Sequence, residues 1–287
     1  MAVDHDIALV TNGEIELRVR AYGDRGRPLL IGLHGWPDSS RGWAHVAPLL
    51  ADRFYVLTPD LRGFAGSSKP VGTDAYRLSH LISDVHAVAD WAGADRFFMA
   101  GHDFGAMITW SMLMFAPDRV IKAVTMAAPH PQVMKRAAGN LRQISKSAYA
   151  FLMNAGEKGE ALLRSKDFDL LISFAFGAVP AVTADDLAAY KAEWSQPGAF
   201  TAMAEYYRAH YNPDLLNPDI PLELPPVTVP VRYIHGLGDF AFIPELATGS
   251  GDFVEAEFDE VHLDTSHWML YEEPSRVAEL IADWCRA

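Results

Sequence analysis

Cysteine is nearly absent from this 287-residue chain, which has only one, Cys285, near the C-terminus. A single cysteine forms no internal disulfide and no thiolate metal site, so we interpret it as a small hydrophobic residue packed in a helix. The histidines and carboxylates also lack a ligand spacing such as H-E-x-x-H. We therefore expect no metal ion and no cofactor.

Basic residues are few, because 24 lysines and arginines stand against 37 aspartates and glutamates, for a net charge of −13. Such an acidic surface repels phosphate groups, which argues against nucleic acid and anionic membranes as partners. No apolar run of about 18 residues suggests a membrane span, and the first ten residues do not have the pattern of a signal peptide. These absences favour a cytoplasmic protein. They do not decide its oligomeric state, and a homo-oligomer is possible.

What the chain does contain is an alternation of apolar runs and helical stretches. The turn Asn12-Gly13 predicts a hairpin within residues 7–21. Strands that alternate with helices predict an α/β fold with a mostly parallel sheet and helices on both faces. The predicted buried strands lie at 28–35, 53–60, 96–103 and 120–129, with helices at about 40–51, 78–92 and 104–116 between them.

This alternation stops after residue 130. Residues 131–222 show only amphipathic helical periodicity, which predicts a helical cap inserted after the sixth strand into a core domain of residues 1–130 and 223–287. Open α/β sheets bind ligands at the carboxyl ends of their strands, so we expect this lid to cover that edge. The core resumes after a proline-rich linker at 221–230, with strands predicted at 231–239 and 252–261 and a helix at 274–287.

One pentapeptide in this pattern carries chemistry: Gly101-His102-Asp103-Phe104-Gly105, between a predicted strand and a predicted helix. Its frame, G-x-nucleophile-x-G, is the nucleophile elbow of α/β-hydrolases, where serine usually stands at the centre. A carboxylate that attacks an sp³ carbon forms an alkyl ester, which water can then hydrolyse at its carbonyl. Asp103 therefore favours alkylating substrates, which are epoxides or organic halides. A role only as N-cap of the following helix is the alternative.

Five segments in this order resemble the Asp-nucleophile branch of the α/β-hydrolase fold, and most closely its epoxide hydrolases. The resemblance spans roughly residues 25 to 285. It implies a hydrolase acting on ether bonds, which converts a small apolar epoxide and water into a vicinal diol through a covalent ester on Asp103. Ala65 departs from a position that is often polar in this family, which suggests a local change in its loop. The segments are HGWP at 34–37, DLRGFAGSSKP at 60–70, GHDFG at 101–105, GLGD at 236–239 and DTSHWMLYEEP at 264–274.

The other members of a catalytic triad are indicated by their positions. His267 comes after the last predicted strand, which completes the order nucleophile, acid, histidine. Its nearest rival among the histidines, His262, lies inside the strand run rather than after it. Asp239 ends the preceding strand and is the expected partner that orients the imidazole. The backbone N–H groups of Trp36 and Phe104 are expected to bind the oxyanion that forms during ester hydrolysis.

The resemblance also gives the helical segment a part in the reaction. Two tyrosines, Tyr149 in KSAY and Tyr207 in AEYYRAH, are expected to donate to the epoxide oxygen as the ring opens. Together with Trp36 and Phe104 they are the expected substrate-binding residues. The resemblance further implies a cis peptide bond between Trp36 and Pro37.

Two other functions stay open at this stage. A haloalkane or haloacid dehalogenase needs hydrogen-bond donors for the leaving halide, and relatives of that kind carry tryptophan directly after the nucleophile or arginines on the following helix. This chain has Phe104 and Met107 there, although the Trp36 indole N–H could still hold a halide. A relative that binds a ligand without turnover is the third alternative, which the complete set of triad residues disfavours.

Overall fold

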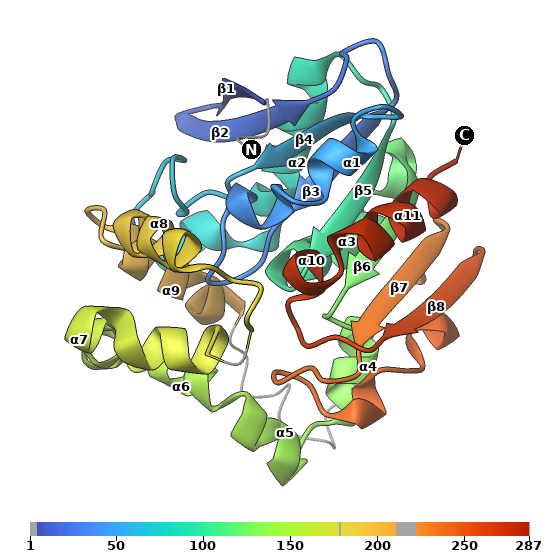
Figure 1. Cartoon of the computed structure of the whole chain (residues 1–287). Helices are drawn as coiled ribbons and strands as arrows, with labels where there is room; N and C mark the ends of the chain where they lie inside the picture. The colour runs from blue at the N-terminus through green and yellow to red at the C-terminus, as the bar shows by residue number, and fades with distance from the viewer. Residues whose placement is uncertain (1–4, 178, 211–221, 287) are drawn as a thin grey trace.

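The computed structural model of the chain describes residues 5–177, 179–210 and 222–286. Within these residues, eight strands form one sheet in the order β1-β2-β4-β3-β5-β6-β7-β8 (Figure 1). β2 pairs antiparallel with both β1 and β4, and the other neighbours pair parallel, which confirms the predicted sheet. The strands are β1 Asp6–Asn12, β2 Ile15–Tyr22, β3 Leu29–Leu33, β4 Tyr55–Pro59, β5 Phe97–His102, β6 Val120–Met126, β7 Val231–Gly236 and β8 Phe258–Leu263.

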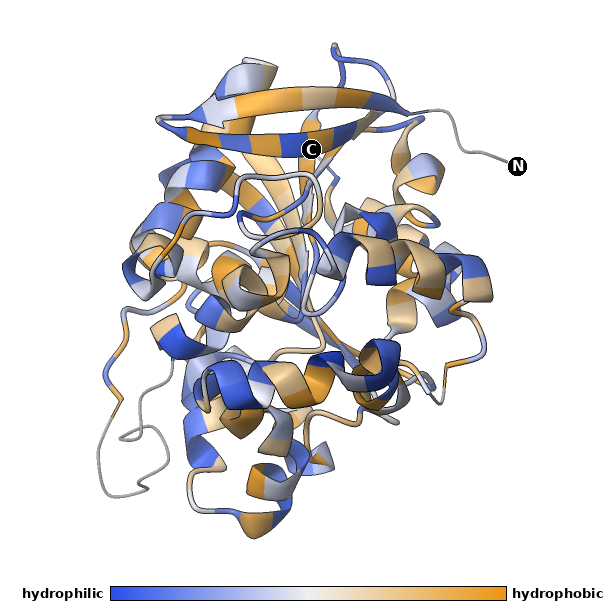
Figure 2. Ribbon diagram, turned by 90° about the vertical axis from the view of Figure 1, so that its left-hand side faces the viewer, coloured by the Kyte–Doolittle hydropathy of each residue, from blue (hydrophilic) through white to orange (hydrophobic). Residues whose placement is uncertain are grey.

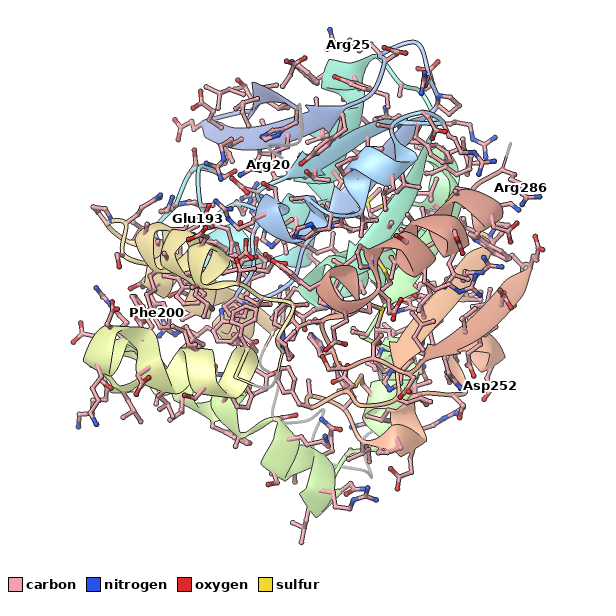
Figure 3. All side chains as sticks on the ribbon, in the orientation of Figure 1. Arg20, Arg25, Glu193, Phe200, Asp252 and Arg286 are labelled. Carbon is pink, nitrogen blue, oxygen red and sulfur yellow. The ribbon has the colours of Figure 1, made fainter. Side chains whose placement is uncertain are left out.

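The central strands are buried because their sequences are largely apolar. Every residue of β3, β4, β5 and β7 is buried, and apolar residues dominate along the middle of the sheet (Figure 2). Exposed charged side chains such as Arg25, Asp252 and Arg286 lie at the periphery of the molecule (Figure 3). A parallel sheet that is covered on both faces needs continuous apolar runs, and this requirement made these strands predictable.

Two pairs of helices cover the sheet, one pair on each face (Figure 1). The single helix predicted at 40–51 is only partly correct. A 3₁₀ turn at Ser40–Trp43 is followed by one short α-helix, α1, at Ala47–Leu50. Pro48 fits the first turn of α1, but its missing N–H and its ring prevent a helix from running through it from residue 40. One pair is α2 Leu78–Ala92 with α3 Phe104–Phe115, and the other is α1 Ala47–Leu50 with α11 Pro274–Trp284, which follows α10 Met269–Glu272.

A helical insertion follows the sixth strand, as predicted, and lies beyond the carboxyl ends of the parallel strands (Figure 1). The predicted end of the cap and the start of its linker fall in residues 211–221, outside the described residues, so the division into two domains stays a prediction. Among the described residues, no helix is long and apolar enough to cross a membrane. The insertion contains α4 Pro131–Arg136, α5 Leu141–Lys146, α6 Ala148–Asn154, α7 Glu157–Ala175, α8 Ala184–Trp194 and α9 Ala199–His210.

The last strand begins later than predicted. Residues Ser250–Phe253 form a 3₁₀ turn after Gly249, whose φ of 90° favours glycine. Val254 then pairs with Val227 in an isolated bridge instead of joining the sheet. β8 itself is an edge strand with partly exposed side chains. Its sequence is therefore not a continuous apolar run, and its start is hard to predict.

Candidate active site

The predicted elbow is a strained turn between β5 and α3. Asp103 has φ 53° and ψ −117°, a backbone conformation that is rare for residues other than glycine. A Cβ on Gly101 would lie 2.2 Å from the carbonyl oxygen of Gly105, and a Cβ on Gly105 would lie 2.3 Å from that of Leu33. The two glycines therefore allow α3 to pack directly against the sheet, and the turn holds Asp103 at the carboxyl end of β5.

The N-cap alternative for Asp103 is wrong, because its side chain makes no capping hydrogen bond to α3. Instead, its carboxylate faces two other groups. One oxygen accepts a hydrogen bond from the Trp36 backbone N–H at 2.7 Å, and the other lies 3.5 Å from Nε2 of His267. The strained turn thus directs the carboxylate away from its own helix, which is a common feature of functional sites.

Asp103, His267 and Asp239 come together from the ends of three strands. His267 is buried, and its Nδ1 lies 2.8 Å from Oδ2 of Asp239. The other Asp239 oxygen accepts backbone N–H groups from Ala241 at 2.7 Å and Phe242 at 3.2 Å. The imidazole therefore bridges two carboxylates, and one of these carboxylates is fixed by its own loop.

The charges of this cluster stabilise one another. Burial alone would raise the pKa of Asp103, but the hydrogen bond and charge of His267 hold it below the ordinary value. The pKa of Asp239 is lowered by His267 in the same way. Burial disfavours the imidazolium, yet the two carboxylates together raise the pKa of His267 to about 10. At neutral pH the cluster is thus an imidazolium between two carboxylates.

Two further histidines near this region have other partners. His102 precedes Asp103 and is fully buried, and its Nε2 donates to the backbone carbonyl oxygen of His267 at 2.8 Å. This contact supports the loop that carries the imidazole. His262 lies in β8, where it contacts Glu260 and the carbonyl oxygen of Ala247. Its position explains why it is not the histidine beside Asp103.

The loop after β3 supplies the first expected oxyanion donor. It passes so close to the elbow that a Cβ on Gly35 would lie 2.4 Å from that of Asp103. In the same loop, the peptide bond between Trp36 and Pro37 is cis. Phe104 is the first residue of α3, so its N–H has no partner within the helix. The Trp36 N–H thus donates to the Asp103 carboxylate, and the Phe104 N–H stays a candidate donor at the start of α3.

Tyr149 of α6 and Tyr207 of α9 lie against each other above the elbow. Their ring centroids are 5.7 Å apart with the planes perpendicular. Trp36 stacks on Tyr149, and Phe104 meets the edge of Tyr207. Burial raises the pKa of both hydroxyl groups, and the charge of Asp103 raises it further. Both tyrosines are therefore protonated donors at neutral pH.

Tyr206 has a different environment from its neighbour, although both lie on α9. Its side chain is fully buried, and its hydroxyl donates to the backbone carbonyl oxygen of Arg62 at 2.8 Å. Adjacent residues on a helix point about 100° apart. Tyr206 therefore packs against the core, whereas Tyr207 reaches the cavity described next.

A cavity of about 330 Å³ joins the nucleophile to the tyrosines. Four expected residues bound it, namely Asp103, Phe104, Tyr149 and Tyr207. Trp36 is only 4% exposed and lies behind Tyr149. Most of the remaining lining is apolar and was not predicted individually, because helical periodicity does not show which apolar face meets a cavity. It includes Met107, Pro131, Met134, Ala138, Ile144, Ala150, Phe151 and Phe242.

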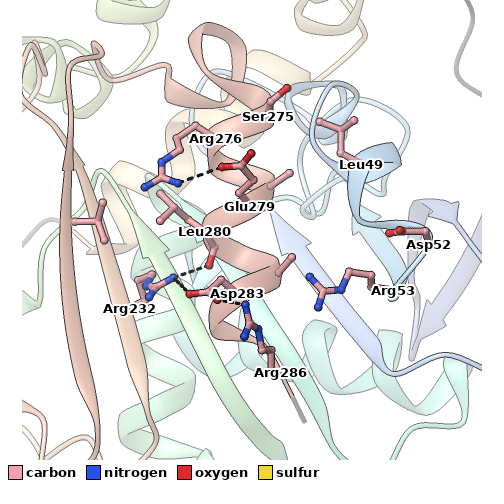
Figure 4. A pocket seen from close by; sticks show the side chains of 13 residues that line it. Leu49, Asp52, Arg53, Arg232, Ser275, Arg276, Glu279, Leu280, Asp283 and Arg286 are labelled. Atoms are coloured by element: carbon pink, nitrogen blue, oxygen red, sulfur yellow. Dashed lines mark hydrogen bonds and ion pairs between the residues drawn. The ribbon is translucent and has the colours of Figure 1, made fainter.

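A second hollow, of about 770 Å³, lies beside α11 and the ends of α1 and β7 (Figure 4). Several of its charged side chains pair with one another or with the backbone: Arg276 with Glu279, Arg286 with Asp283, and Arg232 with the carbonyl oxygen of Leu280. The smaller cavity is the one that contains Asp103 and the tyrosines, so we place the candidate active site there. Within the described part of the chain, no group of three or more His, Cys, Asp or Glu side chains could hold a metal ion.

Comparisons with known proteins agree with this fold. A family model described as the alpha/beta hydrolase fold matches residues 28–274. The AB hydrolase superfamily protein YfhM of Bacillus subtilis is 34% identical over 96% of both chains. Human epoxide hydrolase 4 is 27% identical over 96% of this chain and 77% of its own. The crystal structure of Bacillus megaterium epoxide hydrolase with an inhibitor superposes with a TM-score of 0.86 at 26% identity, covering 96% of this chain and 99% of the other.

Proposed function

This chain belongs to the α/β-hydrolase fold family, and we propose that it is an epoxide hydrolase that converts a small apolar epoxide and water into a vicinal diol. The observation that carries the proposal is the shared cavity of an ionised carboxylate, Asp103, and two protonated tyrosines, Tyr149 and Tyr207. The names of similar proteins, human epoxide hydrolase 4 among them, support the same reaction.

In the first step, a carboxylate oxygen of Asp103 attacks one carbon of the three-membered ring. The bond between that carbon and the ring oxygen breaks, which leaves an alkyl ester on the enzyme and an alkoxide on the neighbouring carbon. An alkoxide is a poor leaving group in an apolar cavity, so it needs a proton as it forms. Tyr149 or Tyr207 donates this proton, and the other hydroxyl holds the same oxygen by a hydrogen bond.

In the second step, water hydrolyses the ester at the Asp103 carbonyl. Esterification has removed the Asp103 charge, which is one of the two that raise the pKa of His267. The imidazolium can then give up its proton, which passes through solvent to the tyrosinate left by ring opening, and the neutral imidazole takes a proton from the attacking water. Backbone N–H groups of Trp36 and Phe104 stabilise the oxyanion. Its collapse expels the diol oxygen, which receives the proton back from His267. The carboxylic acid left on Asp103 then passes its proton to the imidazole, and Asp239 stabilises the imidazolium.

Dehalogenation is the second candidate function, and one observation favours it. The indole Nε1 of Trp36 is buried without a hydrogen-bond partner among the described residues, which makes it an unused donor next to the two cavity tyrosines. Phe104 and Met107, however, offer no donor where similar dehalogenases hold the leaving group. We therefore rank it second to ring opening.

The proposed reaction needs the core and the insertion together. We propose that residues 1–130 and 223–287 form the core domain and that 131–222 form a cap over the carboxyl ends of the strands. The acidic composition argues against nucleic acid and anionic membranes as partners, and we propose a cytoplasmic enzyme with a small-molecule substrate. No metal or cofactor takes part in either step.

The variant His267→Gln tests the proposed function, because the two steps need different residues. Mixed with an epoxide such as styrene oxide, this variant should accumulate an adduct at Asp103, read by intact-protein and peptide mass spectrometry. The mass should rise by that of the whole epoxide, since ring opening expels nothing. A halide substrate would instead add only its alkyl group.

A matched control is His262→Gln, which changes a histidine of β8 that contacts Glu260 outside the cluster. It should turn over epoxides as the unchanged protein does, with no adduct. Normal turnover by His267→Gln would exclude the ester mechanism. Absence of turnover by the unchanged protein across a panel of epoxides and haloalkanes would instead favour a relative that only binds its ligand.

A further inference from the structure

Helix α5 of the insertion contacts the loop that carries the catalytic acid. This acid loop, residues 239–243, leaves β7 and continues to a 3₁₀ turn at Pro244–Leu246. Lys146, the last residue of α5, donates from Nζ to the carbonyl oxygen of Asp239 at 3.0 Å and to that of Phe240 at 2.9 Å. A single ammonium group thus binds two successive peptide groups, the first of which belongs to the acid itself.

Gln143, one turn earlier on α5, binds the other end of the acid loop. Its side-chain Nε2 donates to the carbonyl oxygen of Ala241 at 2.8 Å, and its Oε1 accepts the N–H of Ile243 at 3.0 Å. Gln143 is only 5% exposed, so loss of its amide would leave two backbone groups without partners in a largely buried place. Buried polar groups in that state are unfavourable, and the loop would have to shift to satisfy them.

A shift of the acid loop would disturb the catalytic pair directly. The Asp239 carboxylate is held by the N–H groups of Ala241 and Phe242, which belong to the same loop. The ring of Phe240 also packs 5.1 Å from the imidazole of His267. The positions of the Asp239 carboxylate and of the Phe240 ring that packs on the imidazole therefore depend on the loop backbone that α5 binds.

We infer that Lys146 and Gln143 are positioning residues that hold Asp239 in place for ester hydrolysis, and this inference rests on the proposed function. Neither side chain contacts Asp103 or His267 in the hydrogen bonds described above; both act through the acid loop. Tyr149 follows Lys146 by three residues, at the start of α6. One short segment of the insertion, residues 143–149, thus serves both half-reactions, ring opening through Tyr149 and hydrolysis through the acid loop.

The inference predicts an unequal effect on the two steps. Lys146→Met removes the charge and both donors but keeps the length of the side chain, and Lys146 is not part of the cavity lining. Misplacement of a supporting group by about 1 Å can cost about 100-fold in rate. We expect decay of the Asp103 ester to slow by about 10-fold to 100-fold, and its formation to slow by much less, so the ester accumulates during turnover.

The experiment is single-turnover rapid quench with styrene oxide, in which ester formation and decay are followed separately by mass spectrometry. Lys146→Arg restores a cationic donor and should recover most of the decay rate. Gln143→Met tests the other end of the loop and should also slow decay more than formation. Gln143 lines the cavity, unlike Lys146, so only a loss specific to decay in both variants supports the inference. Lys158→Met, which changes an exposed lysine of α7, is the matched control and should leave both rates unchanged.

Equal slowing of formation and decay in Lys146→Met and Gln143→Met would overturn the inference, because the effect would then come from the insertion as a whole or from Tyr149. Unchanged decay in both variants would overturn it as well. If Lys146→Met does not fold, Gln143→Met alone decides between these results. Failure of the unchanged protein to form any ester would refute the proposed function, and is distinguishable because the reference protein itself is then inactive.

Discussion

Replacement of Asp103 by asparagine should lower the pKa of His267. Asparagine keeps the shape of the carboxyl group but removes its charge, as esterification does in the proposed reaction. The imidazolium then loses one of its two neighbouring carboxylates, while Asp239 and the burial of the ring stay the same. Because a negative charge favours the protonated ring, its removal makes the proton easier to lose.

The size of the effect follows from the distance between the two groups. His267 Nε2 lies 3.5 Å from the Asp103 carboxylate, and an opposite charge at such a separation typically moves a pKa by about one to three pH units. The pKa of His267 is raised to about 10 in the unchanged protein. Its imidazole should therefore stay protonated well above neutral pH, and in Asp103→Asn it should titrate about one to three pH units lower.

The assay is a pH titration of the histidine ring nitrogens by ¹⁵N NMR. The variant His267→Gln identifies the signal by its loss. A His267 signal that titrates near the ordinary value of 6.5 in the unchanged protein would refute the ion cluster. An identical titration in Asp103→Asn would show that the Asp103 charge does not control the protonation of His267.

Two further predictions concern the chemistry of the cavity. The double variant Tyr149→Phe with Tyr207→Phe should open epoxides at least about 10²–10⁴-fold more slowly, whereas each single variant keeps partial activity, since the other hydroxyl can donate. Ring opening by the double variant at the unchanged rate, measured as ester formation, would remove the tyrosines from the mechanism. Diol formation should also survive treatment with EDTA, and a loss of activity that returns when a metal ion is added would contradict a metal-independent reaction.

The order and type of the core strands and helices could be predicted because each is determined largely by the residues of its own segment. The central strands are continuous apolar runs, as a covered parallel sheet requires. The frame around Asp103 needs glycine on both sides, since Gly101 and Gly105 have no room for a Cβ. Prediction was less accurate where two features of one segment conflict. Residues 40–51 have a helical pattern, but Pro48 prevents a continuous helix there.

The triad positions could be predicted for a related reason. Carboxyl ends of neighbouring parallel strands lie at one edge of a sheet, so residues that end consecutive strands meet in space. β5, β6, β7 and β8 are neighbours in that order, which brings Asp103, Asp239 and His267 together. The protonation state of the cluster could not be predicted, because it depends on burial and on distances of a few ångströms.

The insertion shows the limit of such reasoning. Its helices hold core loops by hydrogen bonds to backbone carbonyl groups. Trp194 of α8 donates to Pro37 at 2.8 Å, Tyr206 of α9 donates to Arg62 at 2.8 Å, and Lys146 of α5 donates to the acid loop. A backbone carbonyl belongs to every residue, so neither partner in these contacts has a sequence signature.

These contacts also change what the insertion does for the site. If it only covered the cavity, its side chains would need to be apolar and of suitable size, which is all that amphipathic periodicity conveys. Instead, Trp194 binds the loop that carries the proposed oxyanion donor, and Lys146 binds the loop that carries the proposed acid. The geometry of the core loops therefore depends on the insertion, so activity should be more sensitive to these polar side chains than to most of the apolar residues around them.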